Sequence, residues 1–146
     1  MTDKPEVQFL DAQLCFALYS CSKAIVGAYS TQFSKLGITY PQSLVVVSLL
    51  EQGEQSVGGL SKTLLLDSGT LTPLLKRMAG QNLIERTRST KDERVVMVKL
   101  TKEGCALSDG IAQAQEDVSC GVAMPPDESE AFRGQIKALN LRLRAM

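Results

Sequence analysis

Cysteine is the residue type in this sequence that could do chemistry. The chain of 146 residues contains no histidine and four cysteines, Cys15, Cys21, Cys105 and Cys120. The lack of histidine excludes most zinc sites, haem attachment and any catalytic scheme that needs an imidazole base. No C-x-x-C pair occurs, so the spacing leaves a cysteine-only metal site open without indicating one, and we expect no cofactor. We interpret Cys21 as structural, because it lies about 240° round a helix from Cys15, and Cys105 as a bystander.

Cys15 lies in the stretch LDAQLCFALYSCSKAIVGAYSTQF, whose apolar spacing predicts one long, buried helix from about Glu6 to Ser34. A cysteine in an apolar helical stripe is usually a small buried hydrophobic residue. Cys15 would lie well inside this helix, away from the N-terminus that favours a thiolate, and no residue one turn away is cationic. A reactive Cys15 would therefore need hydrogen bonds from a distant group. Tyr29 lies about 21 Å away along the same helix, but Tyr29 or Tyr40 of a second subunit could approach Cys15 in an antiparallel dimer.

Length and composition predict a single globular, cytoplasmic domain. Hydrophobic residues make up 44% of the chain and charged residues 22%, which is typical of soluble domains. No apolar run approaches the ~20 residues that cross a bilayer. The first residues, MTDKPEVQ, lack the pattern of a secretion signal. We therefore expect no membrane partner and no disulfide framework of the secreted kind.

Basic residues gather in one segment although the formal net charge is zero. Residues 76–102 contain eight Lys and Arg residues and three acidic residues, a local excess of five positive charges that the rest of the chain balances. This separation is typical of a DNA-binding segment on an acidic scaffold. A charged run is more often only a solvated surface, so the pattern alone does not decide.

The elements that would position these residues follow the order of a winged helix-turn-helix. Ser56 is predicted to cap a short helix and Asp67 to cap the next one, SGTLTPLLKRMAGQ. The segments LIERTR and RVVMVKL are typical of two strands, joined by the polar turn STKDE. Thr101 would cap a helix over about residues 102–120, and a last helix would cover about residues 127–144. We therefore predict a mainly helical α+β fold.

The second helix and the hairpin of this module carry residue types that contact DNA. In a winged helix-turn-helix the second helix enters the major groove, and the hairpin reaches the adjacent backbone or minor groove. The polar face of the helix would present Ser68, Thr70, Thr72, Lys76 and Arg77, and the hairpin tip Arg88, Lys91 and Arg94. The alternative is a mixed α+β domain with a solvated helix and a charged hairpin.

The segments QLCFALYS, ITYPQ, DSGTLTPLLKRM and KDER together resemble the multiple antibiotic resistance regulator (MarR) family, specifically its organic hydroperoxide resistance regulators. The resemblance covers about residues 10–101. It implies a homodimeric repressor on a pseudo-palindromic operator, with interlocked helices at about 6–34 and 102–145 around a winged module at about 56–101, all in one domain of residues 1–146. The glycines of SVGGLSK depart from the family pattern. The implied DNA-binding residues are Ser68, Thr70, Thr72, Lys76, Arg77, Arg86, Asp92 and Arg94, with Asp92 orienting Arg94 in the minor groove.

The same resemblance implies that Cys15 senses an organic hydroperoxide. Its thiolate, held by hydrogen bonds from Tyr29 and Tyr40 of the partner subunit, would attack the O–O bond, release an alcohol and become a sulfenic acid. In the two-cysteine branch a resolving cysteine of the partner then forms a disulfide, and Cys120 falls at the matching place. The disulfide would shift helices and move the winged modules out of register with the operator.

Two other functions remain open at the level of sequence. One is a repressor of the same fold controlled by a phenolic or other small ligand in the dimer crevice, in which case Cys15 is dispensable. The other is a thiol peroxidase that uses Cys15 and Cys120. The DNA-binding pattern and the lack of a cation near Cys15 argue against the peroxidase, so we do not expect an enzyme. An interaction domain without DNA binding is disfavoured by Arg94 and the basic helix face.

Overall fold

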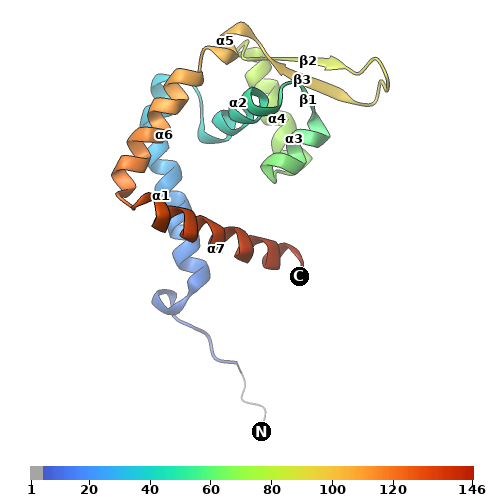
Figure 1. Cartoon of the computed structure of the whole chain (residues 1–146). Coiled ribbons are helices and arrows are strands. Elements are labelled where there is room, and N and C mark those ends of the chain that lie inside the picture. The colour runs from blue at the N-terminus through green and yellow to red at the C-terminus, as the bar shows by residue number, and fades with distance from the viewer. Residues whose placement is uncertain (1–4) are drawn as a thin grey trace.

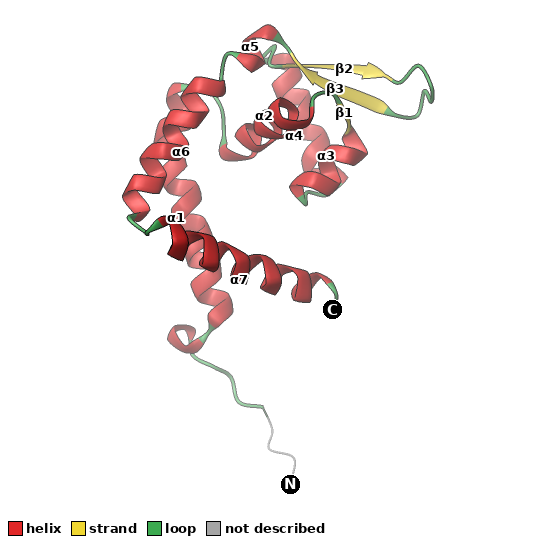
Figure 2. Cartoon of the chain, viewed as in Figure 1, coloured by secondary structure: helices red, strands yellow, loops and turns green. Residues whose placement is uncertain are grey.

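A computed structural model describes residues 5–146 of the chain (Figures 1 and 2). It confirms the predicted α+β, mainly helical fold with a winged helix-turn-helix. The prediction about a secretion signal falls partly on residues 1–4, which lie outside the described residues. The elements are the 3-10 helix η1 (Leu10–Ala12), α1 (Leu14–Lys35), α2 (Tyr40–Gln52), β1 (Gln55–Ser56), α3 (Val57–Leu64), α4 (Ser68–Gly80), β2 (Ile84–Arg88), β3 (Val96–Leu100), α5 (Lys102–Cys105), α6 (Ser108–Val122) and α7 (Pro126–Arg144).

The winged module has a continuous apolar core. Its centre is α2, which is buried along most of its length and is surrounded by α3, α4 and the sheet (Figure 1). Burying such side chains is worth about 1.5–3 kcal/mol each, so this core holds the module together. The most deeply buried side chains of the chain are Phe33, Val45, Val46, Leu60, Leu71, Leu75, Met78 and Val98.

Side-chain caps fix where the helices of the module begin. The predicted caps are confirmed: Ser56 accepts the N–H of Gly59, Asp67 that of Thr70, and Thr101 that of Gly104. Each cap satisfies an N–H group that has no partner within the helix, which stabilises it by about 1 kcal/mol. The cap of α3 compensates in part for its glycines. The sequence SVGGLSK therefore still forms a helix.

The hairpin is part of a small sheet. Within residues 5–146 the sheet is antiparallel and has three strands, in the order β1-β3-β2. The two long strands pair Arg86 with Val98 and Glu85 with Lys99. The turn between them is held by its own bonds, since Ser89 N–H donates to the Val95 carbonyl at 2.8 Å. The wing is thus an ordered projection beside α3 and α4.

The long helices lie apart from the module. Helix α6 runs beside α1, and α7 crosses α1 near its first half (Figures 1 and 2). Within the described chain, Phe33 is the one buried residue of α1, and α7 has none. Among residues 5–146, no helix is both long enough and apolar enough to cross a membrane.

Two predicted helix boundaries are wrong. The first helix begins at Leu14 rather than near Glu6, because residues 5–12 have little to pack against in their own chain and Gln13, in extended conformation, donates its side-chain amide to the Gln8 carbonyl at 2.7 Å. The helix predicted over residues 102–120 is interrupted at Ala106 and Leu107. Here α5 is tied to the end of the sheet, whereas α6 must turn to follow α1.

The tie between α5 and the sheet depends on a glycine. A Cβ at Gly104 would lie 2.1 Å from the Leu83 carbonyl oxygen and 2.9 Å from Cδ2 of Leu100. Gly104→Ala should therefore destabilise the protein by roughly 1–3 kcal/mol, measured by urea unfolding at one fixed protein concentration. Gly58→Ala is the matched control, because a Cβ there meets nothing within 4 Å, and it should be neutral or stabilising by up to about 1 kcal/mol. Equal unfolding midpoints for the two variants would contradict this account.

Candidate functional site

Helix α4 separates a buried face from a polar one. Its apolar residues Leu71, Leu74, Leu75 and Met78 are buried in the core. The opposite face is at the surface, where four of the predicted DNA-contacting residues, Ser68, Thr70, Lys76 and Arg77, are exposed and Thr72 is partly so. Since hydroxyls and cations can contact base edges and phosphates, this surface has the composition of a recognition helix.

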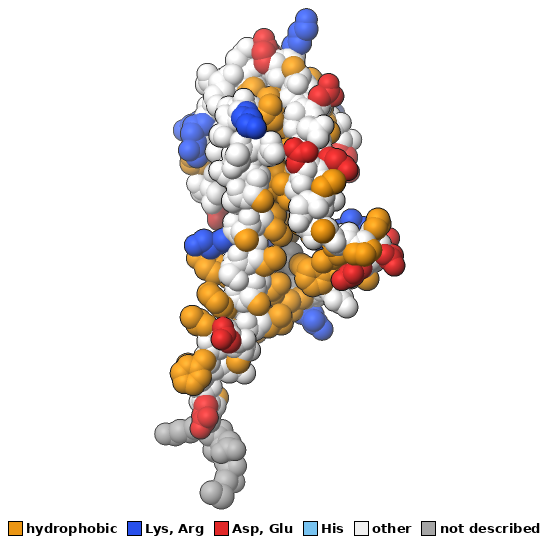
Figure 3. Space-filling view, turned by 90° about the vertical axis from the view of Figure 1, so that its left-hand side faces the viewer, with side chains coloured by type: hydrophobic (Ala, Val, Ile, Leu, Met, Phe, Trp, Pro, Cys, Tyr) orange, Lys and Arg blue, Asp and Glu red, His pale blue; other side chains and the backbone are white. Residues whose placement is uncertain are grey.

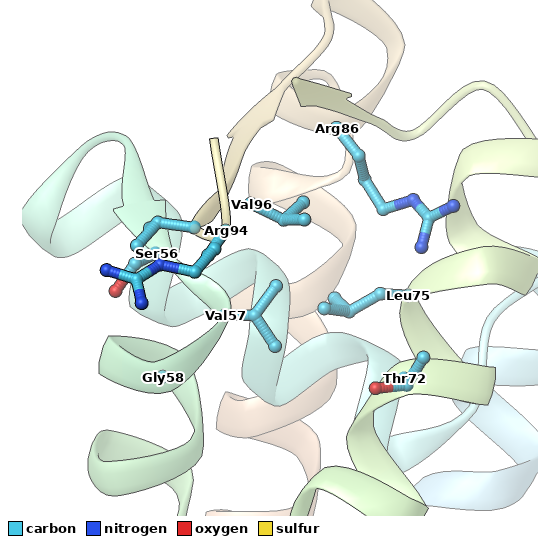
Figure 4. A pocket seen from close by; sticks show the side chains of 9 residues that line it. Ser56, Val57, Gly58, Thr72, Leu75, Arg86, Arg94 and Val96 are labelled. Atoms are coloured by element: carbon cyan, nitrogen blue, oxygen red, sulfur yellow. The ribbon is translucent and has the colours of Figure 1, made fainter. Parts of the chain in front are cut away.

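A hollow of about 360 Å³ lies between α3, α4 and the wing. Figure 4 shows Arg94 beside Ser56 at one side of it and Arg86 at the other, with Thr72 on α4. The structure thus brings together three predicted residues from three elements. Sequence reasoning missed that the start of α3 forms one wall, although the glycines of SVGGLSK were a signal. The lining residues, none of which is acidic, are Ser56, Val57, Gly58, Thr72, Leu75, Arg86, Arg94, Val95 and Val96.

Asp92 holds Arg94 at the wing. The Arg94 guanidinium donates from Nε to Asp92 Oδ1 at 3.1 Å and from Nη2 to Oδ2 at 3.3 Å, and the Arg94 backbone N–H also donates to Oδ1. These bonds from Arg94 lower the pKa of the Asp92 carboxyl. The Arg94 side chain is 91% exposed, so the pair adds little stability. Its effect is to restrict the directions in which the cation points.

Another cation of the hairpin is neutralised within the sheet. Lys99 Nζ lies 3.1 Å from Glu85 Oε2 on the neighbouring strand. Glu85 and Asp92, the partners of Lys99 and Arg94, are already included in the net charge of residues 76–102, so these two ion pairs leave that charge unchanged. The Arg88 guanidinium itself donates to the Glu93 carbonyl at 2.8 Å.

Cys15 lies at the start of a helix. The prediction from sequence that it lies well inside the helix is therefore wrong. Because α1 begins at Leu14, Cys15 is in its first turn and is exposed. The N–H groups of a first turn have no partner within the helix and favour a nearby negative charge. Cys15 thus lies at the start of α1, with the exposed apolar side chains Leu14 and Phe16 on either side of it in the chain.

The two tyrosines expected to act together are adjacent in the structure. The ring centroids of Tyr29 and Tyr40 are 5.1 Å apart, and Tyr29 also stacks on Phe33 at 5.1 Å. Partial burial, together with the neighbouring Tyr40, raises the pKa of Tyr29. Its hydroxyl therefore stays protonated, and able to donate a hydrogen bond, to a higher pH than usual. The pair forms one potential donor site at the junction of α1 and α2.

Cys120 lies near the end of α6, where the sequence placed it. Its Sγ is 3.6 Å from Oε1 of Glu116, one turn earlier. The hydrogen bond and charge of Glu116, with a smaller contribution from Asp117, raise the pKa of the Cys120 thiol. In the described chain all four cysteines are exposed and free of disulfides. Within residues 5–146, no group of three or more Cys, Asp or Glu side chains could hold a metal ion.

An apolar surface extends over α1 and α7. Figure 3 shows hydrophobic side chains gathered over the lower half of this face. A hollow of about 660 Å³ lies between the two helices, with Tyr40 at its border, and Cys21 lines it together with a second hollow between α1 and α6. Cys21 is thus at the surface of the single chain. The large exposed apolar side chains of the two helices are Leu14, Phe16, Tyr19, Ile25, Val26, Phe132, Ile136, Leu141 and Leu143.

Comparison with known proteins places this geometry among transcriptional regulators. The family described as "Transcriptional regulator SarA/Rot" matches residues 28–111. The organic hydroperoxide resistance transcriptional regulator of Bacillus subtilis (strain 168) is 45% identical over 109 residues, which are 75% of this chain and 74% of the relative.

Two solved structures of AbfR, a protein of Staphylococcus epidermidis, are also similar to the chain. Reduced AbfR bound to DNA superposes with a TM-score of 0.77 at 30% identity, over 92% of this chain and 94% of that one. Disulfide-formed AbfR superposes with a TM-score of 0.66 at 31% identity, over 89% and 91% of the two chains.

The paired arginine of the wing can be distinguished from an ordinary surface cation. Arg94→Ala should weaken binding to a specific duplex by roughly tenfold or more, whereas Lys99→Ala should have a smaller effect, because Arg94 lines the hollow beside α4 and Lys99 does not. Asp92→Asn should also weaken binding, although it removes a negative charge, since Arg94 loses its orientation. Fluorescence anisotropy at fixed salt measures all three. Equal losses for Arg94→Ala and Lys99→Ala would show that only total charge matters.

The contact between Cys120 and Glu116 predicts a pH effect. Because Glu116 raises the pKa of the thiol, Glu116→Gln should lower it, so that thiolate forms at a lower pH. Alkylation of Cys120 by iodoacetamide, followed at neutral pH by mass spectrometry, should then be severalfold faster than in the wild type. Asp109→Asn, earlier on the same helix, is the control and should leave the rate unchanged. A wild-type rate in Glu116→Gln at every pH would rule out the contact.

Proposed function

The chain belongs to the SarA/Rot family of MarR-like transcriptional regulators and is not an enzyme, and we propose that it is a homodimeric, DNA-binding repressor that organic hydroperoxides inactivate by oxidising Cys15. This family membership removes the thiol peroxidase alternative. The observation that carries the redox part is the place of Cys15, exposed in the first turn of α1. Acting on the chromosome, the protein would work in the cytoplasm.

We infer the dimer from the apolar surface of α1 and α7, which stays exposed in the single chain. Helix α7 has no buried residue within the described chain, and the apolar side chains of α1 face solvent. Exposed apolar patches of this extent mark interfaces, and a second copy offers a matching surface. Intertwined α1, α6 and α7 helices would then hold two winged modules at a fixed separation.

The two modules would bind a pseudo-palindromic operator. Each α4 would enter a major groove, with the two helices about 34 Å apart, which is one turn of DNA. Arg94, oriented by Asp92, would reach the adjacent minor groove, where the negative potential attracts arginine. The contacts proposed for α4 are those of Ser68, Thr70, Thr72, Lys76 and Arg77, and Arg86 would bind the backbone beside the hollow.

The sensing step is proposed to begin at the Cys15 thiolate. The sulfur attacks one oxygen of the hydroperoxide, the O–O bond breaks, and the other oxygen leaves as the alcohol after taking a proton. The Cys15 sulfenic acid then condenses with the thiol of Cys120 from the partner subunit, forming a disulfide and releasing water. In the dimer, Tyr29 and Tyr40 of the partner subunit would donate hydrogen bonds to the thiolate before it reacts.

Two observations support this sequence of events. The rings of the two tyrosines are already adjacent within each chain, 5.1 Å apart between centroids, so both belong to one surface that a partner's Cys15 could approach. The chain also resembles reduced, DNA-bound AbfR more closely than disulfide-formed AbfR, with TM-scores of 0.77 and 0.66. A relative of this chain thus exists in a disulfide state whose shape differs from that of the DNA-bound one.

The decisive experiment is operator binding with and without oxidant. Wild type, Cys15→Ser and Cys120→Ser are compared at fixed salt on a duplex from the upstream region of the protein's own gene, before and after a slight excess of cumene hydroperoxide. The wild type should be released and Cys15→Ser should stay bound, because it lacks the reacting thiol. Cys120→Ser should reach the sulfenic acid without the intersubunit disulfide, which non-reducing electrophoresis detects.

The hollow between α1 and α7, about 660 Å³ and mostly apolar, favours one alternative. A repressor controlled by a phenolic or other small ligand would use such a space, and Cys15 would be dispensable. If Cys15→Ser is released by hydroperoxide as readily as the wild type, peroxide sensing at Cys15 is wrong and ligand control becomes the better proposal.

A further inference from the structure

Gln81, the residue directly after α4, connects distant parts of the chain through one side-chain amide. Its Nε2 donates to the carbonyl of Gly37, in the turn that follows α1, at 3.0 Å. Its Oε1 accepts from Nε2 of Gln42, on α2, at 2.9 Å. Its backbone N–H donates to the Arg77 carbonyl at 3.0 Å, so the side chain is anchored at the end of the helix that presents the proposed DNA contacts.

Gln42 closes these bonds into a loop. It is 4% exposed, and its Oε1 accepts the backbone N–H of Thr39 at 3.0 Å, while its own N–H donates to Thr39 Oγ1 at 3.4 Å. These hydrogen bonds run from Gly37 to Gln81, from Gln81 to Gln42, and from Gln42 back to Thr39. The Gln81 side chain thus bridges the turn between α1 and α2. A buried polar group without a partner costs about 1–3 kcal/mol, so the buried amide of Gln42 is held by its bonds to Thr39 and to Gln81, whose own side chain is exposed.

The same turn carries one of the two paired tyrosines. Tyr40 follows Thr39 directly, and its ring lies 5.1 Å from that of Tyr29 on α1. Ser43 donates its hydroxyl to the Tyr40 carbonyl at 2.6 Å, which fixes the backbone at this point. A displacement of Tyr40 therefore moves Thr39, the cap that Thr39 forms with Gln42, and the acceptor and donor groups that hold Gln81.

We propose that Gln81 is a positioning residue that couples the Tyr29–Tyr40 pair to the recognition helix. The proposal rests on the proposed function, in which oxidation of Cys15 changes what the tyrosine hydroxyls bind. The apolar contacts of α4 with the core are non-directional, so they allow small rotations. The two hydrogen bonds of the Gln81 amide are directional, and they link the end of α4 to the turn that carries Tyr40.

The test measures how strongly oxidation affects operator binding. The ratio of operator dissociation constants, oxidised over reduced, is determined for wild type, Gln81→Ala, Gln81→Glu and Gln52→Ala. Gln81→Glu keeps oxygens that accept from Gln42 but, when ionised, cannot donate to the Gly37 carbonyl. Gln52→Ala replaces an exposed glutamine at the end of α2 and is the control. Thermal unfolding and the rate of Cys15 thiol loss are followed in each variant.

The expected result separates coupling from folding. In Gln81→Ala, the operator affinity of the reduced protein and the rate of Cys15 oxidation should stay close to wild type. The ratio of oxidised to reduced dissociation constants should fall by roughly three- to tenfold, which is within the range of coupling residues. Gln81→Glu should change the ratio in the same direction, and Gln52→Ala should not change it.

Three results would overturn the proposal. A wild-type ratio in Gln81→Ala shows that the amide does not couple the sites. If Gln81→Ala lowers both the thermal stability and the operator affinity of the reduced protein, while Gln81→Glu keeps the wild-type ratio of dissociation constants, Gln81 has a structural role only. If the wild type itself binds DNA but hydroperoxide does not release it, the proposed function fails and this inference fails with it.

Discussion

The burial of Phe33 fixes the end of the first helix to the winged module, while α6 packs along the same helix. Phe33 is 1% exposed and lies against the core of the winged module, with Tyr29 and Tyr40 stacked beside it. The opposite end of α1, which carries Cys15, is exposed. The helix is about 33 Å long, from its 22 residues, so Cys15 and Phe33 lie near its opposite ends. A movement at the Cys15 end would reach the module along α1 through the aromatic contact and through α6.

Two helix boundaries could not be predicted from sequence because they depend on contacts between distant parts of the chain. Caps such as Ser56 and Asp67 were predictable because they bond to a backbone group three residues away. The start of α1 was not, because residues 5–12 have the composition of a helix but little to pack against in their own chain. The break at Ala106 was not predictable either, because α5 packs against the end of the sheet, where Gly104 lies against the Leu83 carbonyl, and local pattern does not reveal this contact.

Some residues of the candidate site could be predicted from the sequence, and others could not. The polar face of α4 follows from residue type and spacing, and the pair of Asp92 and Arg94 was implied by the family resemblance; the structure shows both at the surface. The interpretation of Cys15 as an interior helix position was wrong, because it depended on the misplaced start of α1. The amide link from Gln81 to Gly37 spans 44 residues, so no sequence period could indicate it.

The exposed face of α7 has a consequence for the life of the protein in the cell. A newly made chain without a partner presents Leu141 and Leu143 to solvent, which is the kind of surface that chaperones and proteases recognise in incompletely assembled proteins. In the proposed dimer, association would remove this surface, and mass action would make the fraction assembled depend on total concentration. Turnover of surplus chains would then set a lower limit on the abundance at which the regulator persists, independently of any signal it receives.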